Sequence, residues 1–195
     1  MNMKSFVSEG KHSIMSSKMK KTSTKKLVYA AMLLAVAILL PSITGNIPKV
    51  GNALCPMHIP VLLCGFICGW PWGLAVGFIA PLLRSVLFGV PPIIPKGLSM
   101  AMELATYGIV AGIMFKRLPQ RVGNIYLTLI TAMLCGRVVW GLMRALLANA
   151  TGEPFTLPMF VAGGFTTAIP GIILQIIAIP LIIIALQKNK IIPIK

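Results

Sequence analysis

Apolar runs long enough to cross a bilayer occupy most of the chain between residues 27 and 187. A transmembrane helix needs about 20 mainly apolar residues, so this stretch has room for roughly six of them. Composition agrees, because 57% of the 195 residues are hydrophobic, 11% are charged, and mean hydropathy is +0.90. The sequence therefore predicts an all-α membrane protein with six transmembrane helices and excludes a soluble catalytic domain.

Proline, glycine and tryptophan mark the boundaries between the predicted helices. The sequence Trp70-Pro71-Trp72 divides one long apolar run, since proline suits the first turn of a helix and tryptophan favours the membrane interface. Residues 45–57 contain two glycines and two prolines, which predicts a non-helical loop long enough to serve as a lid. The predicted spans are 27–44, 59–69, 73–88, 97–115, 125–148 and 159–186.

Basic residues concentrate at the two ends of the chain and in one connection, 116–121. Because cytoplasmic segments of membrane proteins carry an excess of lysine and arginine, both termini are predicted to be cytoplasmic. Residues 1–26 and 188–195 are then basic cytoplasmic tails, the first of them disordered, on either side of a transmembrane domain at 27–187. The net charge of +15 does not indicate a nucleic-acid partner, since these residues form no folded basic face.

Four ionisable side chains interrupt the predicted spans, and such residues are functional candidates because a charge inside a bilayer is costly. They are Arg84, Glu103, Arg137 and Arg144. In the predicted topology they lie in or near the outer half of the membrane, where three arginines outnumber one glutamate. This pattern predicts one arginine held by Glu103 and another that grips an anionic group of a substrate, since a guanidinium fits a carboxylate.

Other polar residues complete the candidate substrate-binding site. His58 begins the second predicted span, Tyr107 lies one helical turn beyond Glu103, and Asn149 stands near an outer connection. Two other interpretations stay open at this point. One is a purely structural Arg84–Glu103 salt bridge, and the other is arginines that extend to the outer headgroups.

The sequence lacks the motifs of ATP hydrolysis and of metal chemistry. It contains neither a phosphate-binding loop nor a dinucleotide-binding fingerprint. Its four cysteines lack the paired spacing of a zinc site. We therefore expect no enzyme activity, no metal site and no cofactor in this chain.

Several stretches are similar to one family of membrane proteins. Ala31 and Ala35 place two small side chains on one face of the first span, which lets another helix approach closely. A long first loop follows, and then the sequences PMHIPVLLCGFICG, PLLRSVLFG and AMELATYG. Over about residues 25–187 these features resemble the substrate-binding S component of an energy-coupling factor (ECF) vitamin transporter.

The resemblance implies a transporter subunit in a prokaryotic cell membrane. Such a subunit binds a vitamin or its precursor from outside, while ATP is used by two cytoplasmic partner ATPases. Ala31 and Ala35 would dock on a transmembrane coupling protein, and residues 45–57 would cover the substrate. The partners would then topple the S component within the membrane and expose the substrate to the cytoplasm.

The substrate is predicted to carry a carboxylate, because positive charge is in excess at the candidate site. The sequence around His58, Arg84 and Glu103 resembles family members linked to pantothenate. Folate and a deazapurine such as queuine stay open, whereas the few aromatic residues of the outer half disfavour riboflavin and thiamine. A stand-alone secondary transporter is the alternative from another class, although residues 27–115 and 123–187 show no internal repeat.

Overall fold

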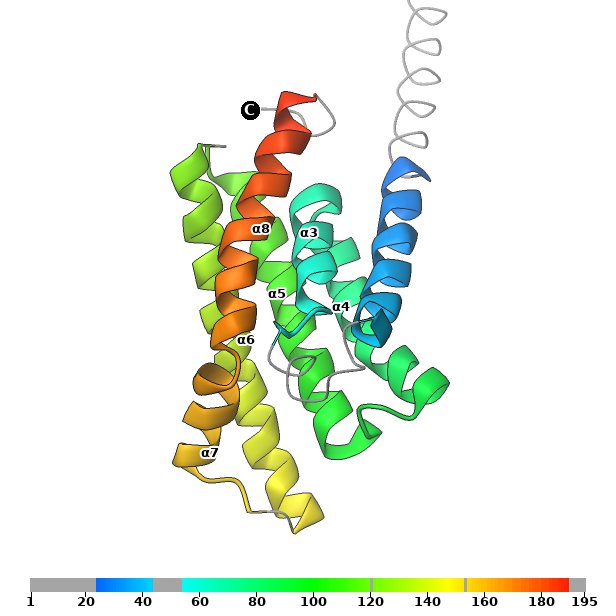
Figure 1. The fold of residues 1–195 in the computed structure, drawn as a ribbon, viewed down its shortest axis with the longest axis vertical. Coiled ribbons are helices and arrows are strands. Elements are labelled where there is room, and N and C mark those ends of the chain that lie inside the picture. Colours follow the sequence, from blue (N-terminus) through cyan, green and yellow to red (C-terminus); the bar gives the residue numbers. More distant parts are fainter. Residues whose placement is uncertain (1–23, 44–53, 120, 153, 190–195) are drawn as a thin grey trace, which may run out of the picture.

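The computed structural model describes residues 24–43, 54–119, 121–152 and 154–189, and every element within them is helical (Figure 1). The first helix, Thr24–Ile43, is followed by α3 (His58–Cys68), α4 (Trp70–Phe88), η1 (Ile93–Gly97), α5 (Leu98–Arg117), α6 (Val122–Thr151), α7 (Leu157–Val161), η2 (Ala162–Thr166) and α8 (Ile169–Lys188). Of the two η segments, η2 is a π-helical turn, whereas η1 contains a kink at Ile94, whose backbone is extended. The all-α prediction is confirmed for this part of the chain. Most of both predicted tails, and residues 45–53 of the predicted lid, lie outside it.

Five described helices are long and apolar enough to cross a membrane. They are Thr24–Ile43, Trp70–Phe88, Ile93–Arg117, Val122–Thr151 and Ile169–Lys188. This establishes a multi-pass membrane protein, but the prediction of six full-length spans is not confirmed.

The predicted second and sixth spans differ from the helices that form. The second, α3, has 11 residues, which at 1.5 Å per residue is only about half of a bilayer core. The sixth was expected to be continuous over 159–186, yet α7 and η2 are separated from α8 by a turn at Thr167 and Ala168. Sequence explains the break, because Gly163-Gly164 weakens the helix and Pro170 favours a new first turn.

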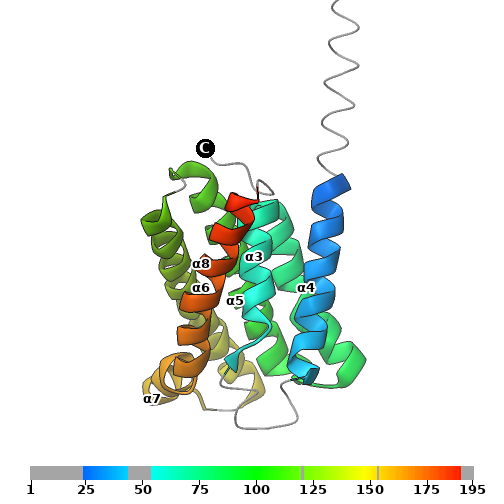
Figure 2. The same cartoon turned by 45° about the horizontal axis from the view of Figure 1, so that its top comes forward.

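The two ends of the helical bundle differ in charge. The first helix begins and α8 ends at the same end of the bundle (Figure 1, Figure 2), which we call the near end. The connections at 88–93 and 151–157 lie at the opposite, far end. Described lysines and arginines of the near end are Lys25, Lys26, Lys116, Arg117, Arg121 and Lys188, whereas Lys96 follows the far-end connection. The excess of lysine and arginine at the near end predicts that this end is cytoplasmic.

Glycines hold α3, α4 and α5 in backbone contact. A Cβ atom added to Gly73 of α4 would lie 2.8 Å from the Cα atom of Gly108 on α5, and one added to Gly65 of α3 would lie 2.8 Å from the Gly108 carbonyl oxygen. Gly77 of α4 meets the backbone of Leu104 in the same way. Small residues permit such close helix approach within membranes, so α5 is fixed at the centre of the bundle.

Gly108→Ala is therefore expected to lower the free energy of unfolding by about 1–3 kcal/mol, because the added methyl group meets backbone atoms that cannot rotate away. Thermal unfolding in detergent measures this loss. Gly123→Ala in the first turn of α6 is the matched control, since a Cβ atom there has nothing within 4 Å. Equal free energies of unfolding for the two variants would contradict the close backbone contact of Gly108 with α3 and α4.

Candidate functional site

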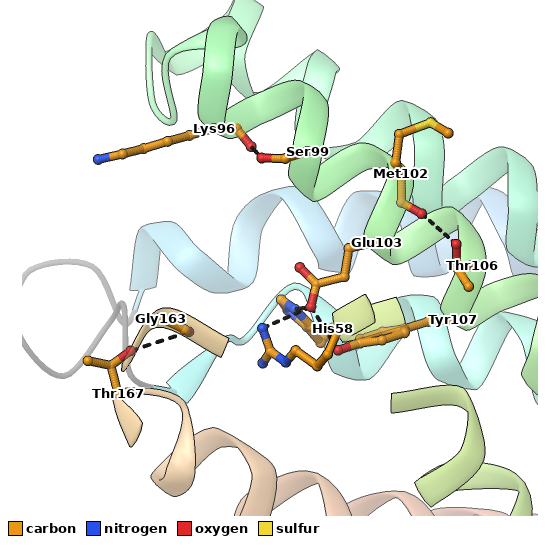
Figure 3. A network of polar contacts seen from close by, with 10 residues as sticks. His58, Lys96, Ser99, Met102, Glu103, Thr106, Tyr107, Gly163 and Thr167 are labelled. Atoms are coloured by element: carbon orange, nitrogen blue, oxygen red, sulfur yellow. Dashed lines mark hydrogen bonds and ion pairs between the residues drawn. The ribbon is translucent and has the colours of Figure 1, made fainter. Parts of the chain in front are cut away.

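A buried polar cluster centred on Glu103 of α5 lies inside the bundle, and Figure 3 shows His58, Glu103 and Tyr107 converging there. The Oε1 atom of Glu103 accepts a hydrogen bond of 2.8 Å from the Tyr107 hydroxyl and forms a 2.8 Å ion pair with Nη1 of Arg137. The Nε2 atom of His58 is 3.6 Å from the same oxygen. None of the four residues is more than 5% exposed.

Gly136 on α6 determines how closely α6 approaches this cluster. A side chain there would collide with the ring of Tyr107, and its Cβ atom would lie 3.1 Å from the Glu103 carbonyl oxygen. The adjacent residue, Arg137, is thereby brought to Glu103. The sequence predicted that Glu103 holds one arginine, and the structure shows that this arginine is Arg137.

His58 reaches the bundle interior because α3 begins there. Cys55 adopts a left-handed backbone conformation, with φ of 45°, which is costly for a residue other than glycine. Its carbonyl oxygen accepts a 3.0 Å hydrogen bond from the backbone N–H of His58. Burial raises the pKa of the Cys55 thiol, and nearby Arg137 opposes this rise only in part. The thiol therefore stays protonated at neutral pH and adds no charge beside the cluster.

The cluster has polar groups that lack a hydrogen-bond partner among the described residues. These are Nε and Nη2 of Arg137 and both ring nitrogens of His58. Nε and Nη2 form one edge of the guanidinium, the geometry that donates two parallel hydrogen bonds to a carboxylate. Since a buried unpaired donor costs about 1–3 kcal/mol, the arrangement is chemically incomplete and suits an anionic ligand.

Arg84 has a different environment. Its Nη1 atom donates hydrogen bonds to the Ile38 carbonyl oxygen at 2.8 Å and to the Ser42 hydroxyl at 3.2 Å, and its guanidinium lies 5.4 Å from the centroid of the Phe88 ring. The suggested Arg84–Glu103 salt bridge is wrong, because the ion pairs of Glu103 in the described chain are with His58 and Arg137. Carbonyl groups near a helix C-terminus attract cations, and here they hold Arg84 at the end of the first helix.

Substrate contact by Arg84 stays a prediction, and the structure offers anchoring of the first helix as the alternative. If Arg84 anchors the first helix, Arg84→Met should lower the free energy of unfolding by about 1–2 kcal/mol, because charged hydrogen bonds are lost. Substrate affinity should then stay unchanged. Thermal unfolding and ligand titration on the same preparation measure both. Lower affinity at unchanged stability would instead favour a substrate contact.

Arg144 and Asn149 lie further along α6 toward its far-end terminus. Arg144 is partly buried, with its guanidinium 5.5 Å from the centroid of the Phe155 ring, and Asn149 is exposed. The three arginines thus contact three different sets of residues and do not form one cationic site. Binding roles for Arg144 and Asn149 stay predictions.

An aromatic cluster near Arg144 was missed by the sequence argument. Trp140 lies 5.8 Å from Phe155 and 6.1 Å from Phe160, and Phe160 lies 5.9 Å from Phe165, between ring centroids. The sequence indicated few aromatic residues in the outer half but not their clustering, since folding gathers these rings from α6, α7, η2 and a connection. The regular spacing of Phe155, Phe160 and Phe165, five residues apart, was the sequence signal for it.

Ala31 and Ala35 are exposed on the first helix, whereas Ala30, Leu33 and Ala37 are buried. The small-residue face predicted for docking therefore points away from the bundle. Exposure leaves it accessible to another membrane helix.

Comparison with known families gives one match, which covers well over half of the chain. Residues 25–183 match the family described as ECF transporter, substrate-specific component. No curated protein and no solved structure matches the chain.

Proposed function

The chain belongs to the substrate-specific components of ECF transporters, and from that premise we propose that it captures a small carboxylate-bearing vitamin, or a precursor of one, for import. Members of this family bind substrate and work with a module made of a membrane coupling protein and ATPases. The proposal gives ATP hydrolysis to those partners and substrate capture to this chain.

The observation that carries this proposal is the unpartnered Nε–Nη2 edge of Arg137. Glu103 neutralises Arg137 through Nη1 and fixes its plane, so the opposite edge is pre-organised for a second carboxylate. The ring nitrogens of His58, near the same Glu103 oxygen, add hydrogen-bonding capacity. A carboxylate with nearby hydroxyl groups matches these donors.

Pantothenate is the first substrate that we propose, because it combines a carboxylate with hydroxyl groups and an amide. The aromatic cluster of Trp140, Phe155, Phe160 and Phe165 favours a second candidate of the same transporter class. Planar rings stack on such side chains, which suits folate or a deazapurine such as queuine.

We propose that the near end of the bundle faces the cytoplasm of a prokaryotic cell and that the far end receives substrate. The basic residues of the near end support this orientation. Release then follows from toppling of the whole chain, with Ala31 and Ala35 on the coupling protein.

Mass spectrometry of small molecules that copurify with the full chain tests the substrate. Uptake into proteoliposomes tests the mechanism, with the coupling protein, both ATPases and ATP present or individually omitted. We expect uptake only with the complete set. Uptake driven by an ion gradient alone would instead identify a secondary transporter.

A further inference from the structure

We infer that Gln175 of α8 is a second substrate contact, which selects a molecule with an amide-like group, an N–H beside a C=O, in addition to its carboxylate. The inference rests on the proposed function, since it assigns the other end of the same substrate. It gives a role to a buried side chain that the Glu103 cluster does not use.

The side-chain amide of Gln175 is buried without a partner. Its exposure is 0%, and neither Nε2 nor Oε1 has a hydrogen bond in the described structure. It is also the one polar side chain between Ile169 and Leu186 in the sequence of α8. A buried amide requires both a donor and an acceptor as partners, and a ligand amide or lactam edge supplies both at once.

Gln175 faces the helices that carry the Glu103 cluster. It belongs to a buried stripe with Gly171, Ile179 and Ile183, spaced one helical turn apart. Helix α8 packs against α3, which begins with His58, and against α6, which carries Arg137. Figure 1 and Figure 2 show α3 and α8 running in the same direction toward the near end.

The depth of Gln175 follows from its position along the chain. A Cβ atom on Gly164 would lie 4.0 Å from Cδ of Arg137, so Gly164 is level with that residue. Gln175 comes six residues after the start of α8 at Ile169, which corresponds to about 9 Å along the α8 axis toward the near end at 1.5 Å per residue. Gln175 is the seventh of the 20 residues of α8 and Arg137 the sixteenth of the 30 residues of α6, so both lie away from the two ends of the bundle.

The two side chains lean in opposite directions along the bundle axis. Helical side chains point toward the N-terminus of their helix. The N-terminus of α8 is directed to the far end and that of α6 to the near end. A ligand that reaches both groups would place its carboxylate on the Arg137 guanidinium and its amide on Gln175.

Two matched variants and two probes test this assignment. Gln175→Leu removes the amide at similar volume, and Gln187→Leu is the control on the same stripe, where Gln187 has other contacts. Pantothenate carries both groups, whereas pantothenol keeps the amide but has an alcohol in place of the carboxylate. Isothermal titration of the full chain in detergent measures both affinities.

We expect Gln175→Leu to weaken pantothenate and pantothenol alike, by about 10- to 100-fold, because the ligand amide is left unpaired. Arg137→Lys should weaken pantothenate by a similar factor and pantothenol little. Gln187→Leu should change neither affinity. Unchanged affinity of Gln175→Leu for both probes overturns the inference, even where Arg137→Lys upholds the carboxylate site.

Stability without ligand provides a second, independent measurement. Gln175→Leu should raise the melting temperature of the ligand-free chain by about a few degrees, because it removes an unpaired buried amide. A lower melting temperature would show that Gln175 has a structural partner and would overturn the inference. If the wild-type chain binds neither pantothenate nor pantothenol, pantothenate is not the substrate. The test of Gln175→Leu is then whether this variant still retains the molecule that mass spectrometry finds copurifying with the wild-type chain, and full retention overturns the inference.

Discussion

Arg137→Met should abolish substrate binding and lower the free energy of unfolding by about 3–5 kcal/mol. The guanidinium forms a 2.8 Å ion pair with Glu103, whose exposure is 2%. Removing it leaves a buried carboxylate whose remaining partners are the Tyr107 hydroxyl, at 2.8 Å, and Nε2 of His58, at 3.6 Å. It also removes the one guanidinium edge that is proposed to receive the substrate carboxylate. Chemical or thermal unfolding and ligand titration measure the two losses.

The double variant Glu103→Leu with Arg137→Met separates stability from binding. An apolar pair of similar volume avoids the uncompensated buried charge, so most of the lost stability should return. Binding should not return, because the guanidinium edge is still absent. A double variant that binds substrate like the wild type would show that Arg137 is structural only.

Ala31→Trp together with Ala35→Trp should abolish uptake by the assembled transporter while leaving substrate affinity within about twofold. Both alanines are exposed on the first helix and distant in sequence from the Glu103 cluster. An indole at each position prevents the close helix approach that small residues permit. Copurification with the coupling protein and transport in proteoliposomes measure the effect.

Val36→Trp provides the matched control for docking. Val36 is also exposed on the first helix, but about 100° around the axis from Ala35. The Val36→Trp variant should retain both assembly with the coupling protein and transport. Full transport by the variant that carries both Ala31→Trp and Ala35→Trp would show that these two residues are not part of the docking surface.

Apolar runs and their breaks were sufficient to predict the fold class and most helices. The Trp70-Pro71-Trp72 turn begins α4, and the 116–121 connection separates α5 from α6 as expected. Hydropathy did not predict which of the apolar runs form full-length spans, because it does not distinguish a helix that crosses the membrane from a short buried helix such as α3. Nor does it detect the turn at Thr167 and Ala168, because apolar residues continue on both sides of it.

The residues of the candidate site were predicted from the sequence, but the arginine that pairs with Glu103 was not. Glu103, Arg137, His58 and Tyr107 were all candidates, and the structure brings these four together. A salt bridge between Arg84 and Glu103 was one interpretation left open, since the two residues lie on helices joined by one short turn. The actual partner comes from α6, since pairing depends on which faces meet, and Gly136 sets that contact through Tyr107.

The missed residues have a common cause. Gln175 is a single amide in an apolar helix, which by sequence alone looks like an isolated exception. Its significance depends on burial and on the lack of a partner, and both are properties of the folded chain. The same holds for the aromatic rings around Trp140, which come from four different segments.

Gly136 also bears on how this transporter subunit can change its substrate. The residue offers no side chain to a ligand, yet it sets the distance between α5 and α6 across the Tyr107 ring. A single methyl group there would move Arg137 away from Glu103 and widen the space beside its open edge. In the proposed site, a substitution at Gly136 would therefore alter the space available to a substrate, while Glu103 and Arg137 stay unchanged.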